Sequence, residues 1–478
     1  MRWDVIGTVA ALGFALTPVG AHAAPLSLED AIRGAWARNP GLAAGEDLVR
    51  AAREDAAAAR DARLPTLSFS AKGIVTDEPM MAFGIKLNEQ KITEADFTPA
   101  RLNAPDPVGG VGLGASVVQP IYVGGRITAG RRAAEAQAGA EARSQERRRD
   151  EIALRVVDAY FGAQVADQGL RFAEDALQHA IETERFVRSR NQQGLALEAD
   201  LARATAFRAQ AEADRATARQ RVASARSALV LLAGDEVADA ELSTPVEHAP
   251  TGAPRSGAAP AAAPSALSLA DASDRRLRRL QSGGSAPTPP PPGERFDASE
   301  RSDLVAARLR ATAADEARTA ARGSLLPEVF AQAGVETLRS SIDQGATWFQ
   351  GLLVARWQLS LGALDGTRAA EARAAAAHSA AAWQERQARR EVDEARRAVE
   401  TADVRVGSAR EAVAASEAAR RLREARHRQG LLPLTDVLDA EAGLAGARSL
   451  LLGSQHQARL ARAQLQLALG QPIEGVKS

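Results

Sequence analysis

Cysteine is absent from this chain of 478 residues, which excludes disulfide bonds, thiol catalysis and thiolate metal sites together. Aromatic residues make up only 4% of the chain, so thick cores of large side chains are not expected, whereas the abundant alanines let helices pack closely. Net charge is also absent. The 60 basic and 60 acidic residues cancel, which argues against a dedicated nucleic-acid-binding protein.

Long apolar runs are missing too, because charges interrupt every apolar stretch after the N-terminus. At the N-terminus, Arg2 precedes an apolar run from Val5 to Leu16 and the small-residue pattern Ala21-His22-Ala23. That run is shorter than the roughly 20 residues that a membrane-spanning helix needs. We therefore predict a signal peptide over residues 1–23. If the mature chain enters a membrane, it must do so through β-strands.

The second half of the chain repeats the first. Gly194 and Gly234 recur 236 residues later as Gly430 and Gly470, each pair enclosing a similar segment (430 − 194 = 470 − 234 = 236). A duplicated unit predicts a symmetric, self-stacking architecture rather than a single catalytic pocket. The function is therefore expected in a surface or a lumen.

Each copy contains two stretches in which apolar and polar residues alternate, the pattern of a strand with one apolar and one polar face. The predicted strands cover residues 66–75, 111–123, 327–337 and 347–361. The first two form a β-hairpin over 66–123, whose connection at 76–110 reads as a proline-containing loop. The other two form a β-hairpin over 327–361.

The rest of each copy has helical periodicity. No proline occurs between Arg126 and Gln193, so a single helix on the order of 100 Å long is expected there. The predicted helical units are the N-terminal helices 24–65, a long hairpin 126–234, a helix 296–326 and a second long hairpin 366–470. A Pro/Ala-rich linker at 235–295 joins the copies, and 471–478 form a tail.

The long helices carry a heptad repeat. Val392, Val399 and Val406 are seven residues apart, and alanines such as Ala395 and Ala402 follow three residues later. Sustained heptads indicate a left-handed supercoil, and alanine in the seam allows close approach. The same pattern would also serve an ordinary helical bundle.

Four strands cannot close a barrel, because the smallest membrane barrels have about eight and an open edge leaves backbone groups unpaired in lipid. A chain that inserts these strands into a membrane must therefore be an oligomer in which each copy supplies a sector. The strand count alone does not fix the number of copies.

The sequence resembles the TolC-like outer-membrane efflux proteins from Leu26 to Gly470. The resemblance is carried by Asn39-Pro40-x-Leu42, Ser302-Asp303-Leu304, the Leu-Pro pairs at 64–65 and 326–327, Gln119-Pro120-Ile121-Tyr122-Val123-Gly124-Gly125-Arg126, and Gly430-x5-Asp436-Val437-Leu438-Asp439-Ala440. It implies a mainly α chain with a membrane β-barrel sector. The implied homotrimer has a twelve-stranded β-barrel in outer-membrane lipid, with loop 76–110 outside the cell, and an α-helical barrel in the periplasm.

The resemblance also implies a role. Such a protein is the passive exit duct of a tripartite efflux or type I secretion system in a Gram-negative cell. A periplasmic adaptor protein opens it at the periplasmic tip, and an inner-membrane pump energises transport. Linker 235–295 would then lie around the equator of the helical barrel, and the choice of cargo would belong to the pump.

The resemblance further suggests a gate at the periplasmic tip. Well-studied members carry a ring of aspartates there, and the matching residues are Asp436 and Asp439. The alternative is that these carboxylates stabilise the start of a helix. Asp200 matches an aspartate of the family's closing contacts, but Leu432 and His427 replace the basic and aromatic partners. His427 opposite Asp200 is a possible substitute.

Gly194 and Gly430 are expected to turn the hairpin tips in a left-handed conformation. The apolar side chains of the tips are Leu195, Leu197, Leu431 and Leu434. We expect them to be at least partly exposed and to form the adaptor docking site. The alternative is that they hold each hairpin together from within.

Two other functions are compatible with parts of the sequence. A periplasmic adaptor also has a long helical hairpin, but normally one hairpin flanked by β-rich domains. A coiled-coil scaffold without transport would lack the alternating strands. The six histidines are dispersed without ligand spacing and no nucleophile motif occurs, so we expect no catalytic residue, metal site or cofactor.

Overall fold

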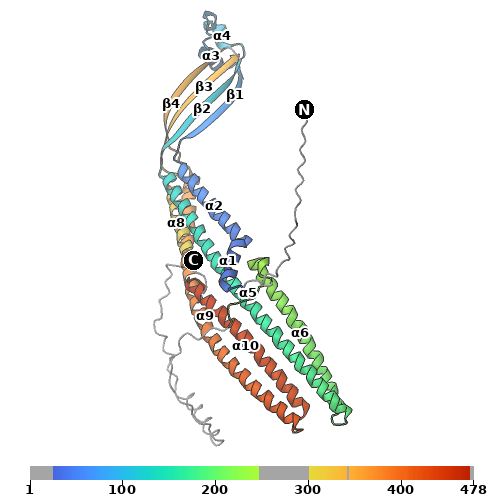
Figure 1. The fold of residues 1–478 in the computed structure, drawn as a ribbon. Helices are drawn as coiled ribbons and strands as arrows, with labels where there is room; N and C mark the ends of the chain where they lie inside the picture. The colour runs from blue at the N-terminus through green and yellow to red at the C-terminus, as the bar shows by residue number, and fades with distance from the viewer. Residues whose placement is uncertain (1–24, 239, 247–300, 342–343, 474–478) are drawn as a thin grey trace, which may run out of the picture.

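The computed structural model describes residues 25–238, 240–246, 301–341 and 344–473. The molecule is elongated, with a four-stranded sheet at one end and the tips of two helical hairpins at the other (Figure 1). The predicted signal peptide 1–23, residues 247–300 of the linker region and residues 474–478 of the tail lie outside the described residues.

The two halves of the chain repeat one plan of helix, strand pair and long helical hairpin. The first half comprises α1 (Leu28–Arg38), α2 (Pro40–Asp61), β1 (Thr66–Thr76), α3 (Pro79–Asn88), η1 (Glu94–Phe97), α4 (Pro99–Asn103), β2 (Val108–Val123), α5 (Arg126–Gln192), α6 (Glu198–Ala233) and η2 (Asp235–Val237). The second comprises α8 (Ser302–Gly323), β3 (Glu328–Ser341), β4 (Gln344–Arg356), α9 (Leu361–Arg428) and α10 (Leu434–Leu469).

Two sequence-based expectations are wrong. Residues 76–110 are not simply a loop but contain α3, η1 and α4, because Pro79 and Pro99 stand at the first turn of a helix, where the missing N–H of proline costs nothing. The fourth strand ends at Arg356 rather than near 361. The long helix then begins at Leu361, because the side chain of Ser360 accepts a hydrogen bond from the Ala363 N–H and caps it.

The sheet is antiparallel throughout, in the order β1-β2-β3-β4, and its register gathers apolar residues on one face. The exposed side chains of this apolar face are Leu67, Phe69, Val75, Val111, Leu113, Val117, Val335, Phe349 and Leu353. The opposite, polar face holds an ion pair between Lys72 and Glu336, which crosses β2 above Gly112 and Gly114. It also carries the exposed Leu352 and Val354 at the end of β4 nearest the helices. The predicted two-faced strands are therefore present.

The long helices α5 and α9, of 67 and 68 residues, pair with α6 and α10 respectively. The predicted heptad seam of α9 is buried against α10: Val392 and Ala395 pack on Ala468, and Ala402 packs on Ala458. Within the described part of the chain, no helix is long and apolar enough to cross a membrane.

The elements of one chain form a row with two ends. Below the sheet the packing order is α2–α5–α8–α9, and towards the tips it is α6–α5–α10–α9. One border of the row is thus formed by β1, α2 and α6 from the first copy, and the other by β4 and α9 from the second. Neither β1 nor β4 has a partner strand on its outer side among the described residues, so the row is open along both borders.

The largest core lies around the middle of α5. Tyr160 and Phe161 are fully buried there with Ile32 of α1 and Leu229 of α6. The Tyr160 hydroxyl donates to the Leu26 carbonyl at 2.7 Å and accepts from the Thr244 N–H at 2.9 Å, within a part-buried site. The core therefore holds Leu26 and the segment after α6 at the same point.

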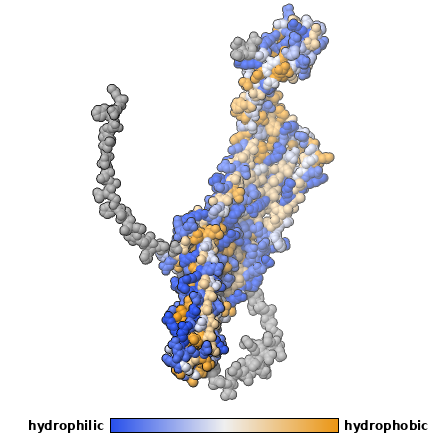
Figure 2. Space-filling view, turned by 90° about the vertical axis from the view of Figure 1, so that its right-hand side faces the viewer, coloured by the Kyte–Doolittle hydropathy of each residue, from blue (hydrophilic) through white to orange (hydrophobic). Residues whose placement is uncertain are grey.

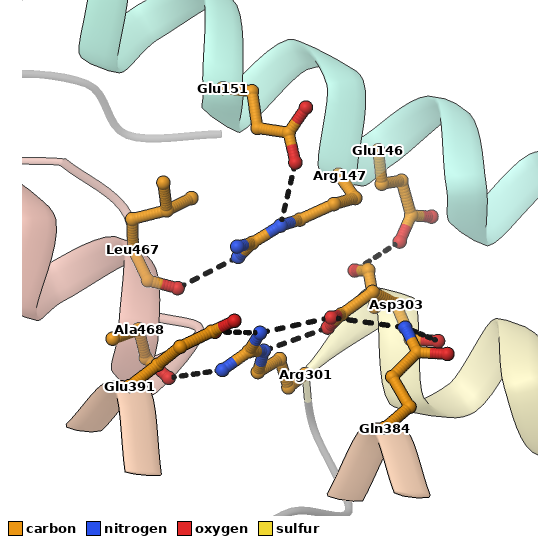
Figure 3. Close-up of polar contacts among 10 residues, drawn as sticks. Glu146, Arg147, Glu151, Arg301, Asp303, Gln384, Glu391, Leu467 and Ala468 are labelled. Carbon is orange, nitrogen blue, oxygen red and sulfur yellow. Dashed lines mark hydrogen bonds and ion pairs between the residues drawn. The ribbon is translucent and has the colours of Figure 1, made fainter. Parts of the chain in front are cut away.

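A buried arginine ties three helices of the second copy together above this core (Figure 3). The Arg301 guanidinium donates to Asp303 at 2.8 Å, to Glu391 of α9 at 2.6 Å and to the Ala468 carbonyl of α10 at 3.1 Å. Arg147 of α5 donates to the adjacent Leu467 carbonyl at 2.9 Å. Burial would raise the pKa of Asp303, but the hydrogen bonds and charge of Arg301 hold that pKa below its usual value. Four helices therefore meet at one charged cluster.

We predict that Arg301→Leu destabilises the protein by about 3 kcal/mol, because it leaves the carboxylates of Asp303 and Glu391 without their buried partner. The measurement is the urea midpoint of unfolding in detergent. The control is Arg50→Leu, which breaks the exposed pair with Asp47 and should change stability by less than about 0.5 kcal/mol. Equal midpoints for the two variants would show that the cluster does not hold the helices together.

Candidate functional site

The two hairpin tips have the same backbone geometry. Gly194 and Gly430 have φ of +73° and +75°, the left-handed conformation expected for them. The Leu195 N–H donates to the Arg190 carbonyl at 2.8 Å, and the Leu431 N–H donates to the Arg426 carbonyl at 3.0 Å. These bonds, with those of the glycine N–H groups, form a Schellman motif that ends the long helix and turns the chain back.

The two tips also contact each other. Leu434, at the start of α10, is 3% exposed and packs on Val187 of α5 and Ala204 of α6. The expectation that Leu434 is exposed is therefore wrong, because the neighbouring hairpin covers it. The other three tip leucines are exposed: Leu195 to 62%, Leu197 to 70% and Leu431 to 68%.

The two candidate gate residues stand on the first turns of α10. Asp436 is half-buried and Asp439 is exposed, and their spacing of three places them on the same side of the helix. The start of α10 has no side-chain cap, and no hydrogen bond or ion pair of either carboxylate exists with any described residue. Neither carboxylate therefore caps the helix through a hydrogen bond, although Asp436 lies in the first turn, where the helix dipole favours its charge.

Asp200 is the equivalent of Asp436 in the first copy and likewise lies in the first turn of its helix, α6. His427 does not pair with it. The Nδ1 of His427 lies 2.8 Å from the Leu432 carbonyl, and its ring stands edge-on to Phe186 with centroids 6.5 Å apart. The proposed substitute contact is therefore wrong: the two residues that depart from the family pattern bind each other within the second tip.

Charged contacts join the two helices of each hairpin above its tip. The sequence analysis did not identify them. In the first hairpin the buried Glu184 of α5 accepts from Thr205 of α6 at 3.0 Å and pairs with Arg208 at 2.9 Å. In the second, Arg420 of α9 pairs with Glu441 of α10 at 3.0 Å. The sequence signal for these contacts is the 236-residue repeat. Arg420 occupies in the second copy the position that Glu184 has in the first, and Glu441 occupies the position of Thr205.

A groove of about 710 Å³ runs between the two hairpins. Its floor consists largely of small side chains, among them Gly162, Ala166, Ala173, Ala445 and Gly453. Ionisable side chains also line it, namely His179, Asp214, Arg221, Arg420, Glu441, Arg448 and His456. The Arg448 guanidinium lies 5.0 Å from the Phe172 ring centroid, a cation–π contact that connects the hairpins.

The sequence matches the family model described as outer membrane efflux protein over residues 31–235 and 298–471. The chain belongs to this family. The resemblance drawn from the sequence is thereby confirmed, and the chain is an efflux channel of the Gram-negative outer membrane with its helical part in the periplasm. This assignment decides against the periplasmic adaptor and the scaffold without transport.

Solved structures of low sequence identity share the fold. CusC is 18% identical, with a TM-score of 0.71 and coverage of 94% of this chain and 93% of that one. VceC, an outer membrane protein of Vibrio cholerae, is 19% identical, with a TM-score of 0.70 and coverage of 94% and 97%. The CmeC outer membrane channel of Campylobacter jejuni is 15% identical, with a TM-score of 0.73 and coverage of 94% and 87%. A comparison with curated protein sequences gives no match.

We predict that Gly430→Ala destabilises the second hairpin by about 1–2 kcal/mol, because a Cβ is disfavoured at positive φ although no atom lies within 4 Å to obstruct it. Gly407→Ala, in the middle of α9 and equally unobstructed, should instead stabilise by about 0.5–1 kcal/mol. Thermal unfolding midpoints measure both. Midpoint shifts of the same sign for the two variants would contradict the left-handed conformation of Gly430.

Proposed function

We propose that three copies of the chain assemble side by side into one closed duct. The observation that carries the proposal is the row of elements with two different open borders, β1, α2 and α6 on one side and β4 and α9 on the other. Unlike borders meet in a head-to-tail ring, and a ring closes without leaving a free edge. Three four-stranded sectors make a barrel of about twelve strands, within the range of membrane barrels.

The two faces of the sheet support this assembly. The apolar face, which includes Phe69, Val111 and Phe349, is exposed in the single chain and would contact outer-membrane lipid. The polar face, with the ion pair of Lys72 and Glu336, would line an aqueous lumen. The long helices continue from the same strands, so the lumen would extend into a helical tube.

The duct works passively with two partners, a periplasmic adaptor and an inner-membrane pump. The tips offer the adaptor three exposed leucines, Leu195, Leu197 and Leu431, and the groove between the hairpins offers a floor of small residues with ionisable side chains around it. Such a surface suits an amphipathic helical partner. Leu434 is not part of this surface, because it is buried between the hairpins.

The gate lies at the tip and consists of Asp436 and Asp439, with Asp200 beside it. Three copies of two carboxylates that have no partner among the described residues would form rings around the axis and make the constriction cation-preferring. Opening would move the second hairpin away from the axis, and the adaptor would shift that equilibrium by binding the open state better.

The test is the single-channel conductance of the purified protein in a planar bilayer. We expect a small, cation-selective conductance that increases and loses selectivity in the double variant Asp436→Ala/Asp439→Ala. The control is Asp175→Ala, which removes an exposed carboxylate of α5 roughly 25 Å from the tip.

The results of this experiment test the duct and its gate separately. A channel that the double variant leaves unchanged would keep the duct and reduce the aspartates to residues that favour the helix start. A folded protein without any conductance would contradict the duct itself.

A further inference from the structure

One strand connection is built differently from the other. Two residues, 342–343, join β3 to β4, whereas α3, η1 and α4 lie between β1 and β2. We call the segment 79–103 the cap. It stands at the end of the sheet farthest from the helical hairpins (Figure 1).

The cap has an internal structure of its own. Phe83 and Phe97 stack edge-on with ring centroids 5.8 Å apart. The carboxylate of Asp96 accepts from the Thr93 N–H at 2.8 Å and from Lys86 at 3.1 Å, and these bonds lower the pKa of Asp96 to about 2. Ala82 and Ile85 of α3 are buried. The cap is therefore a folded unit with its own buried residues rather than an irregular loop.

The cap is fastened to the polar face of the sheet. Ser340 of β3 accepts from Lys91 and donates to Glu89 at 3.0 Å, and α3 packs against β2 and β4. Leu338, which shares the polar face with Glu336, is buried at this end of the sheet. On the apolar face, by contrast, Val335 and Phe349 remain exposed. The cap therefore leans towards the side that lines the lumen in the proposed duct.

We propose that the three caps meet over the axis and form a second constriction at the outer mouth of the duct. This inference rests on the proposed assembly. A barrel of twelve strands about 4.8 Å apart and tilted by about 40° is roughly 25 Å across. A helix with its side chains is about 10 Å across, so three caps suffice to narrow such a mouth severely.

The surface through which the caps meet is apolar, and its occupant is the cap of the next copy. Met80 is 82% exposed, and Leu87 and Phe97 are also exposed. Because α3 packs on β4, the strand that borders the neighbouring copy, the cap already lies beside the junction between copies. In space-filling view, apolar side chains are visible at this end of the molecule (Figure 2).

The first test removes the cap and replaces it with a two-residue Asn-Gly turn. The resistances of two constrictions in series add, so the change in conductance on deletion of the cap depends on whether the tip is open or closed. We expect the deletion to raise single-channel conductance at least twofold in the Asp436→Ala/Asp439→Ala background, and much less when the tip is intact. The substitution Met80→Ser, which keeps the cap, should have a smaller effect than the deletion. Unchanged conductance after deletion in the open-tip background would overturn the inference.

The second test does not depend on the folding of the deletion variant. The chain contains no cysteine, so Met80→Cys introduces the only thiol. A short thiol–thiol cross-linker should join two copies through Met80→Cys but not through Phe349→Cys on the apolar face. Absence of the cross-link from Met80→Cys in a channel that conducts would overturn the constriction. Absence of conductance from the unmodified protein would instead overturn the proposed duct.

Discussion

The hydrogen bonds that one chain cannot make determine the rest of the architecture. A four-stranded sheet leaves the outer backbone groups of β1 and β4 unpaired, and in lipid each such group costs several kcal/mol. The helices share this incompleteness, because the row ends at α2 and α6 on one side and at α9 on the other. Assembly satisfies both requirements at once. A closed channel is then the arrangement in which every copy has a partner along both borders.

Within the sector, a few buried contacts at different heights hold the helices together. Arg301 ties α8 to α9 and α10, the core around Tyr160 fixes α1 and the segment after α6, and Leu434 seals the tips. Between these points the seams are rich in alanine, which allows close packing but buries little area per residue. The tip is therefore held by a small apolar cluster, which suits the opening proposed for it.

The sequence was most informative where period and repeat determine structure. The heptad of α9, the two-faced strands and the paired tip glycines follow from local pattern, and each is present in the structure. Contacts between distant segments could not be predicted in this way. The burial of Leu434 depends on how the hairpins lean together, and the role of Arg301 depends on Glu391 and the Ala468 carbonyl, which lie far along the chain. Pro79 and Pro99 were misleading because proline begins helices as readily as it marks loops.

The most direct test of the account is the mass of the particle extracted in mild detergent, determined by light scattering with the detergent contribution subtracted. The account requires three chains per particle, because only a closed ring removes both open borders of every copy and three sectors supply about twelve strands. A particle of one chain that still inserts and conducts, or a stable particle of two, would contradict it.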